Sequence, residues 1–188
     1  MTTTAPKNFL ITGVSSGLGK AFARAALDAG HTVVGTVRRE SDAEAFAAMA
    51  AERAHPLMLD VTDYDSIPVA VADAQDRAGP IDVLVNNAGY GHEGIMEESS
   101  IDDLQRQFAA NVFGAVAMTK AVLPAMRERR RGHIVNVTSM GGFITMPGIS
   151  FYCGSKFALE GISEALGKEV ASFGIQVTAL APGQFRTD

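Results

Sequence analysis

The segment Tyr152-Cys153-Gly154-Ser155-Lys156 places a phenol and an ammonium four positions apart. Residues at this spacing lie on one face of a helix, so both groups could act at a single site. A phenol, with its ordinary pKa of about 10, is a poor base at neutral pH, but a nearby cation stabilises the phenolate and lowers that pKa. A tyrosine tuned in this way can donate a proton to a developing alkoxide or remove one from an alcohol.

Two further polar residues stand in apolar surroundings. Ser139 follows the run HIVNVT, and its hydroxyl could hydrogen-bond a substrate oxygen. Asn111 interrupts the run FAANVFGAVAM and could relay a proton, through its side chain or through a displaced helix turn with water. Taken alone, each side chain also fits an ordinary role in a turn, on the surface or in the core. Their occurrence together predicts a catalytic set of Asn111, Ser139, Tyr152 and Lys156.

The chain alternates short apolar runs with longer amphipathic stretches. The runs are rich in Val, Ile and Leu, as expected of strands buried on both faces: 8–12, 32–37, 55–60, 82–87, 133–139 and 175–180. The stretches between them are expected to be helices: 17–29, 41–53, 64–78, 102–130 and 152–173. This pattern predicts one α/β domain over residues 1–188, a doubly wound parallel sheet with helices on both faces and ligands at the carboxyl ends of its strands.

A glycine-rich loop follows the first expected strand. The segment TGVSSGLG (12–19) has glycines at the spacing Gly-x3-Gly-x-Gly, and a helix is expected to begin near Lys20. Glycine lets the backbone approach a ligand closely, while a helix N-terminus offers N–H groups and partial positive charge to a pyrophosphate. A tight turn without a ligand is the alternative interpretation. The residues expected to bind a dinucleotide here are Gly13, Ser15, Ser16, Gly17, Leu18 and Gly19.

The second expected strand ends in Val37-Arg38-Arg39 rather than in an acidic residue. An acidic residue at this distance from the loop would bind the ribose hydroxyls of NAD. A guanidinium instead suits the 2′-phosphate of NADP, so we expect NADP(H) to be preferred over NAD(H), with Arg38 as the main contact and Ser16 assisting. The alternative is that both arginines form a solvated strand end.

Two further strand ends fit the same ligand. Asp60 and Val61 close the third strand, where the carboxylate could accept a hydrogen bond from the adenine amine. Asn87, Ala88 and Gly89 close the fourth, where small residues would leave room for a ribose. Asn, Asp and Gly also favour turns for local reasons, so both ends have a structural alternative.

These residues together resemble the short-chain dehydrogenase/reductase family, in its shorter single-domain branch. The resemblance runs from Asn8 to the end of the chain and rests on TGVSSGLG (12–19), DVTD (60–63), NNAG (86–89), Asn111, Ser139, YCGSK (152–156) and PGQFRT (182–187). It implies a Rossmann-type sheet of strand order 3-2-1-4-5-6 and hydride transfer between a nicotinamide and a carbonyl or alcohol carbon. It also implies homodimers or homotetramers formed through the helices that carry Asn111 and Tyr152.

The resemblance assigns a role to each matched residue. Tyr152 would be the acid/base, and Ser139 would polarise the substrate oxygen. Lys156 would hold the nicotinamide ribose and lower the pKa of Tyr152, while Asn111 would anchor the proton relay. The residues expected at the nicotinamide end are Pro182, Gly183, Phe185 and Thr187.

The segments TVRR (36–39) and YCGSKFALEG (152–161) look like those of NADP-preferring steroid and retinol dehydrogenases, a likeness that does not fix the substrate. Apolar residues are also expected near the mouth of the site. They fit an apolar carbonyl or alcohol substrate, and they equally fit packing of the core or of a lid, which we favour. These residues are Met96, Met140, Phe143, Met146 and Ile149.

The sequence departs from the family pattern at two places. Gly154 stands where the family often has alanine, which should cost about 0.5–1 kcal/mol of helix stability. The chain also stops at Asp188, where family members continue through a substrate-covering segment, a helix pair and a seventh strand. A complete chain of this length would have an exposed sixth strand and a pocket that lacks one wall, so we expect a fragment or an incompletely observed protein.

The composition argues against several other kinds of protein. A net charge of -5 argues against a general nucleic-acid binder, and we expect no apolar run long enough to span a membrane. The N-terminus lacks the basic start and apolar core of a signal peptide, and the single cysteine fits a reducing cytoplasm. The four histidines are scattered, so no metal site is expected.

Two other functions remain as alternatives. A dinucleotide-binding sensor or regulatory protein without turnover would keep the glycine loop, but the complete set of four polar residues favours an enzyme. A nucleotide-sugar epimerase would have a larger C-terminal substrate domain and a different loop spacing. The spacing of Gly13, Gly17 and Gly19 disfavours it.

Overall fold

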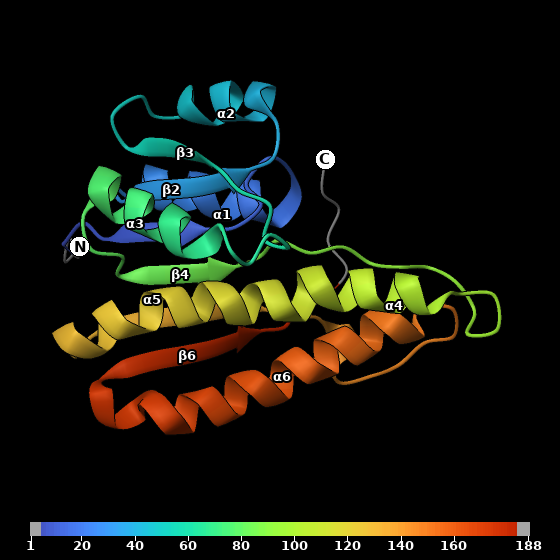
Figure 1. Ribbon diagram of the computed structural model, residues 1–188. Helices are drawn as coiled ribbons and strands as arrows, with labels where there is room; N and C mark the ends of the chain where they lie inside the picture. The colour runs from blue at the N-terminus through green and yellow to red at the C-terminus, as the bar shows by residue number, and fades with distance from the viewer. Residues whose placement is uncertain (1–4, 184–188) are drawn as a thin grey trace.

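Six parallel strands form the central sheet (Figure 1). The computed structural model describes residues 5–183. The strands are β1 (Asn8–Ile11), β2 (Thr32–Val37), β3 (Ala54–Met58), β4 (Val83–Asn86), β5 (Gly132–Val137) and β6 (Ile175–Leu180). Their order, β3-β2-β1-β4-β5-β6, confirms the predicted Rossmann-type arrangement. The order reverses between β1 and β4, which places a ligand crevice outside the carboxyl ends of these strands.

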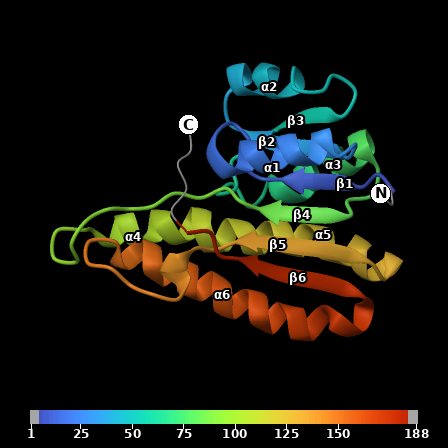
Figure 2. The ribbon, with the colours of Figure 1, turned by 180° about the vertical axis from the view of Figure 1, so that it is seen from behind.

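Helices cover both faces of the sheet, as predicted (Figure 1, Figure 2). One face carries α1 (Gly17–Asp28) and α2 (Glu40–Ala47). The other carries α3 (Ile67–Ala78), α4 (Ile101–Phe108), α5 (Ala115–Arg129) and α6 (Ser150–Val170). Three short helices complete the described chain: η1 (Ala109–Gly114), η2 (Met140–Gly142) and η3 (Ala171–Phe173).

Two apolar clusters bury the two faces of the sheet. Leu10 of β1 packs in the cluster that contains Met118 and Val122 of α5. Its neighbour Ile11 packs in the other cluster, together with Leu27 of α1. Successive strand residues point to opposite faces, so each strand must be apolar throughout. This double burial is the reason for the continuous apolar runs in the sequence.

Two helices differ from their expected extents. The helix expected over 41–53 ends at Ala47. The chain then turns, and the guanidinium of Arg53 donates hydrogen bonds to the carbonyl oxygens of Leu27 (2.6 Å) and His31 (3.1 Å). This anchor ties the turn to the end of α1. The helix expected from residue 64 begins at Ile67, because residues 61–65 form turns after β3.

One helix contradicts our expectation about membrane-length runs. α4, η1 and α5 form a continuous helix, Ile101–Arg129, of 29 residues. Its most apolar stretch of 18 residues has a mean hydropathy of 1.4, which would suffice to cross a membrane by length and composition. Met118, Val122 and Met126 of this helix are buried in the cluster against the sheet. A core helix of a globular domain acquires the same composition, and here one side of the helix packs on the sheet.

Candidate active site

The glycine loop joins β1 to α1 in a conformation that needs its glycines. Gly13 and Gly17 have φ angles of +72° and +57°, a region that other residues rarely adopt. A Cβ on Gly19 would collide with the carbonyl oxygen of Gly13 and with the amide of Asn87. The N-cap residue Ser16 makes no side-chain capping bond, and the first turn of α1 holds no acidic residue. The N–H groups of that turn can therefore bind an anion.

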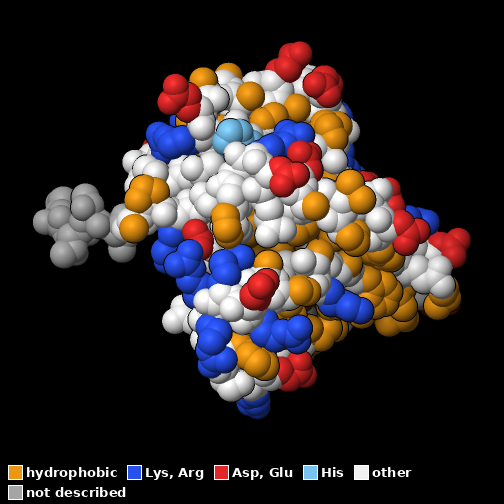
Figure 3. All heavy atoms as spheres, turned by 60° about the vertical axis from the view of Figure 1, so that its left-hand side comes forward, with side chains coloured by type: hydrophobic (Ala, Val, Ile, Leu, Met, Phe, Trp, Pro, Cys, Tyr) orange, Lys and Arg blue, Asp and Glu red, His pale blue; other side chains and the backbone are white. Residues whose placement is uncertain are grey.

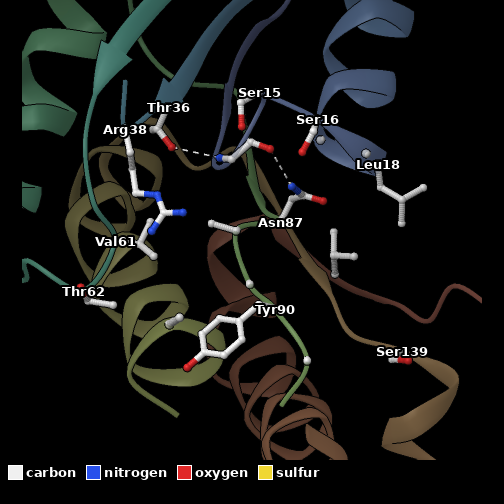
Figure 4. Close-up of a pocket in the computed structure, with 18 of the residues that line it drawn as sticks. Ser15, Ser16, Leu18, Thr36, Arg38, Val61, Thr62, Asn87, Tyr90 and Ser139 are labelled. Atoms are coloured by element: carbon white, nitrogen blue, oxygen red, sulfur yellow. Dashed lines mark hydrogen bonds between the residues drawn. The ribbon is translucent and has the colours of Figure 1, made fainter. Parts of the chain in front are cut away.

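Neighbouring strand ends hold the loop in place. The hydroxyl of Thr12 accepts hydrogen bonds from the N–H groups of Asn87 and Ala88, both at 2.9 Å. The side chain of Asn87 donates to the carbonyl oxygens of Thr12 (2.9 Å) and Gly13 (3.1 Å). The N–H of Gly13 donates to Thr36 Oγ1 of β2 at 3.0 Å, and Figure 4 draws contacts of this kind around the loop. The loop is thus fixed to β2 and β4.

A cleft of about 780 Å³ opens at the carboxyl edge of the sheet. In Figure 4, Arg38 and Val61 lie on one side of this cleft and Ser139 on the other. All the predicted cofactor residues within the described chain line it: Gly13, Ser15, Ser16, Gly17, Leu18, Gly19, Arg38, Asp60, Val61, Asn87, Ala88, Gly89, Tyr152, Lys156, Pro182 and Gly183. Phe185 and Thr187 lie outside the described residues.

Arg38 and Asp60 face each other across the strand ends of β2 and β3. Arg38 Nη1 lies 3.8 Å from Asp60 Oδ2. The other carboxylate oxygen accepts hydrogen bonds from the N–H (2.9 Å) and hydroxyl (2.7 Å) of Thr62. The Thr62 N–H is the main reason that the pKa of Asp60 is lowered, with Arg38 contributing less. The turn that we weighed as an alternative is therefore present, although the carboxylate still lines the cleft.

The second arginine of this strand end is already paired. Arg39 binds the carboxylate of Asp42 with two hydrogen bonds, of 2.7 and 3.0 Å. Arg39 is not among the residues that line the cleft, whereas Arg38 is. The two adjacent guanidiniums therefore have different positions: Arg38 faces the ligand crevice, and Arg39 lies at the start of α2.

Tyr152 and Lys156 reach the cleft from the first turns of α6. The Lys156 ammonium is buried and donates a hydrogen bond to the carbonyl oxygen of Val137 at 2.8 Å. It lies 5.8 Å from the centroid of the Tyr152 ring. Burial lowers the pKa of Lys156 to about 8. The ammonium keeps two further donors for a ligand.

The Tyr152 ring stands in a slot between two glycines. A Cβ on Gly91 would lie 3.6 Å from Tyr152 Cδ2, and a Cβ on Gly141 would lie 3.1 Å from Cε1. The hydroxyl of Ser139 accepts a hydrogen bond from the N–H of Gly141 at 3.0 Å. Ser139 and Tyr152 both line the cleft, so β5, η2 and α6 bring them to the same opening.

Asn111 lies behind the cleft, in the π-helical turn η1. Its side chain is buried and fully engaged: Oδ1 accepts from the N–H of Tyr90 (3.0 Å), while Nδ2 donates to the Tyr90 carbonyl (2.9 Å) and to Ser155 Oγ (3.1 Å). Ser155 in turn donates to the carbonyl oxygen of Tyr152 at 2.7 Å. Asn111 therefore links the loop after β4 to the helix that carries Tyr152.

A family model described as short chain dehydrogenase matches residues 7–188. The chain belongs to the short-chain dehydrogenase family. It is 44% identical over 182 residues to the 3-ketodihydrosphingosine reductase of Bacteroides thetaiotaomicron, a match covering 97% of this chain and 65% of the relative. It thus spans about two thirds of the length of this relative.

Solved structures of this family share the fold. A short-chain dehydrogenase from Streptomyces avermitilis has a TM-score of 0.93 and 46% identity, over 97% of this chain and 67% of that one. The structure of ElxO with NADP bound has a TM-score of 0.92 and 30% identity, over 97% of this chain and 75% of that one. The Rossmann-type core of the family is therefore common to all three chains.

The sequence did not predict several residues that line this cleft or lie behind it. Thr36, Tyr90 and Arg106 also line it. Gln107 is fully buried beside Asn111, and its hydrogen bonds go to the backbone of the loop after β4. Its spacing of four residues from Asn111, on one helical face, is a signal that could have indicated it.

The apolar residues expected at the mouth do not pack as we favoured. Met96, Met140, Phe143 and Met146 are exposed, by 64%, 37%, 62% and 43% respectively. Ile149 alone of the five is partly buried. Within the described residues, core packing is therefore wrong for these four side chains, and their packing under a lid stays a prediction.

Proposed function

We propose that the protein is an oxidoreductase that transfers a hydride between NADP(H) and a carbonyl or secondary alcohol, with Tyr152 as the acid/base. One observation carries the proposal: the glycine loop and the pair Tyr152 and Lys156 open onto the same cleft. A dinucleotide on the loop would extend along the strand ends toward this pair.

The residues present fit such a dinucleotide. The backbone of the glycine loop leaves open the space that Cβ atoms would fill, and the uncapped first turn of α1 suits the pyrophosphate. Arg38 would bind the 2′-phosphate, and the free N–H groups of Lys156 would bind a ribose hydroxyl. NADP(H), when bound, supplies or accepts the hydride.

The chain's own residues would handle the proton. The Tyr152 hydroxyl donates a proton to the substrate oxygen in reduction, and the Tyr152 phenolate accepts that proton in oxidation. The Ser139 hydroxyl hydrogen-bonds the same oxygen and stabilises its developing charge. The side chains of Asn111 and Ser155 are both committed to other contacts, so a proton relay at this position would use water on the backbone of the π turn η1.

The preference for NADP(H) over NAD(H) rests on the end of β2. No acidic residue follows Val37 directly, and the Arg38 guanidinium lines the cleft. The likeness to ElxO with NADP bound supports this choice of cofactor. A guanidinium binds a phosphate through charge and paired hydrogen bonds, which favours the phosphorylated ribose.

We further propose a substrate with an apolar portion. The likeness to a 3-ketodihydrosphingosine reductase supports a ketone with an apolar chain. Met140 and Phe143, in the loop after Ser139, are exposed and would offer such a chain apolar contacts. Methionine adapts well to irregular apolar ligands.

A homo-oligomer in the cytoplasm completes the proposal. Phe113 of η1 and Phe157 of α6 are exposed. Helices α5 and α6 form the layer that faces the viewer in Figure 1. Figure 3 shows hydrophobic side chains gathered on the right of its view, where this layer lies. An exposed apolar face of this kind suits an interface between two copies through helices α5 and α6. The buried, unpaired Cys153 fits a reducing compartment.

The experiment is a panel of ketones and aldehydes, from short-chain to long-chain, offered with NADPH to the full-length protein. Loss of NADPH absorbance in the presence of a carbonyl compound, with faster turnover of the longer apolar ketones, is the expected result. Tight NADPH binding without turnover of any carbonyl or alcohol would instead favour a sensor.

A further inference from the structure

Gln107 of α4 is a buried amide that binds one stretch of backbone. Its side chain is 0% exposed. Oε1 accepts a hydrogen bond from the N–H of His92, and Nε2 donates one to the carbonyl oxygen of Tyr90, both at 2.6 Å. Breaking either bond would leave part of the buried Gln107 amide without a partner, so the amide fixes the backbone. The Tyr90 carbonyl also accepts from Asn111 Nδ2 at 2.9 Å. Gln107 therefore holds the segment from Tyr90 to His92 against α4.

This segment forms one wall of the Tyr152 slot. Gly91 lies between the two residues that Gln107 binds, and its open side faces the ring: a Cβ there would lie 3.6 Å from Tyr152 Cδ2. His92 stacks on Phe151, the residue before Tyr152, with ring centroids 5.5 Å apart and planes 23° apart. The imidazole also bonds Ser99 Oγ at 2.9 Å. Any displacement of the segment would therefore reach Tyr152 directly and through Phe151.

We propose that Gln107 is a positioning residue for Tyr152, acting through the backbone of the segment from Tyr90 to His92. The inference rests on the proposed function, in which the phenol of Tyr152 must stand at a fixed place beside the substrate oxygen. Gln107 does not line the cleft, so it would not touch the substrate or the cofactor. Asn111 also binds the backbone of Tyr90, but it differs from Gln107 because its side chain donates a further hydrogen bond to Ser155 on α6.

The test compares Gln107→Met with Gln105→Met in the full-length protein. Methionine keeps the length and helix propensity of glutamine but makes neither hydrogen bond. Gln105 is exposed on the same helix and serves as the matched control. Gln107→Glu is the conservative variant, because burial favours its neutral carboxyl, which can accept from the His92 N–H and donate to the Tyr90 carbonyl. It also replaces Gln107→Met if that variant does not fold.

The expected kinetic result is a change in kcat alone. In Gln107→Met, kcat for carbonyl reduction should fall about 10–100-fold, since a misplacement of about 1 Å can cost this much. KM and the NADPH Kd should stay unchanged, Gln107→Glu should lose less, and Gln105→Met should match the parent protein. A loss of kcat that equals the loss of NADPH-binding sites would overturn the proposal, because it would report unfolded protein only.

Hydrogen exchange gives a second result that needs no turnover. With NADPH bound, peptides containing His92 and Tyr152 should exchange faster in Gln107→Met than in Gln105→Met. Equal exchange around Tyr152 in the two variants would overturn the role of Gln107. Absence of turnover in the parent protein would refute the proposed function, and the exchange comparison would still decide whether Gln107 positions Tyr152.

Discussion

Lys156 carries a positive charge that the fold removes from water. Burial lowers its pKa from 10.5 to about 8, and the Val137 carbonyl is the one hydrogen-bond acceptor it has among the described residues. At neutral pH the ammonium is still protonated, so it can act on Tyr152 and on a bound ribose. The fold maintains this charge at a cost in stability.

That cost predicts a pH dependence of stability. Between pH 8 and 10.5 the unfolded chain holds the Lys156 proton while the folded chain releases it, so stability should rise with pH in this window. Relative to Lys156→Met, the unfolding free energy of the cofactor-free protein should rise by up to about 3 kcal/mol. Urea denaturation across this range measures it, and parallel pH curves for both proteins would contradict the buried charge.

Arg38 provides a test of cofactor choice. In Arg38→Ala, kcat/KM with NADPH should fall about 10–100-fold, the worth of a hydrogen bond to a charged group, while kcat/KM with NADH stays the same. Arg39→Ala is the control, because that guanidinium pairs with Asp42 and does not line the cleft. An unchanged ratio of NADPH to NADH efficiency in Arg38→Ala would remove the basis for NADP preference.

Single residues differed in how far the sequence could predict them. Tyr152 and Lys156 share one short motif and Ser139 follows an apolar run, and the structure brings all three to one cleft. Asp60 could not be assigned to one role, because its carboxylate both closes a turn and faces Arg38. Gln107 stands four residues before Asn111, which is a weak signal, because its burial depends on the path of the loop after β4.

Among the helices, the π turn η1 that interrupts the long helix could not be located from the sequence. The expected helix 102–130 contains no sequence signal for a π turn at Ala109–Gly114. The nearest indication is Gly114, where a Cβ would lie 2.8 Å from the carbonyl oxygen of Val61. The close approach of the helix to the loop after β3 depends on tertiary packing, which local periodicity does not contain.

α6 has a glycine that the fold does not require. A Cβ on Gly154 would lie 3.8 Å from Phe108, an ordinary contact, so alanine should fit. Gly154→Ala should raise the unfolding free energy by about 0.5–1 kcal/mol with kcat unchanged, because it removes the conformational freedom of glycine within a helix. Denaturant unfolding and the NADPH assay measure both quantities.

Gly141→Ala is the matched comparison. A Cβ at position 141 would lie 3.1 Å from Cε1 of the Tyr152 ring and would press on it. This variant should therefore lose activity even if it folds. Equal activity in Gly141→Ala and Gly154→Ala would show that the slot around Tyr152 is not tight.

For the whole molecule, the strands and their order were more predictable than the exposure of individual side chains. Alternating apolar runs indicated the strands, and the family resemblance implied the order that the sheet has. The exposure of Met96 and Phe143 was not predictable, because it depends on which segments pass over two loops rather than on local pattern. The extent of the helix over 101–129 was predicted to within one residue at each end, whereas its membrane-length apolar stretch was not.

Tyr152 is the group that we propose moves the proton. The cleft that it lines also holds the glycine loop, Lys156 and Ser139, and Gly91 and Gly141 flank its ring. The most direct test is kcat and NADPH affinity of Tyr152→Phe beside Cys153→Ala, whose thiol is buried next to it. For Tyr152→Phe we predict a loss in kcat of about 100–10,000-fold with unchanged NADPH affinity, and for Cys153→Ala nearly full activity. A Tyr152→Phe protein that reduces the carbonyl substrate as fast as its parent would contradict the account.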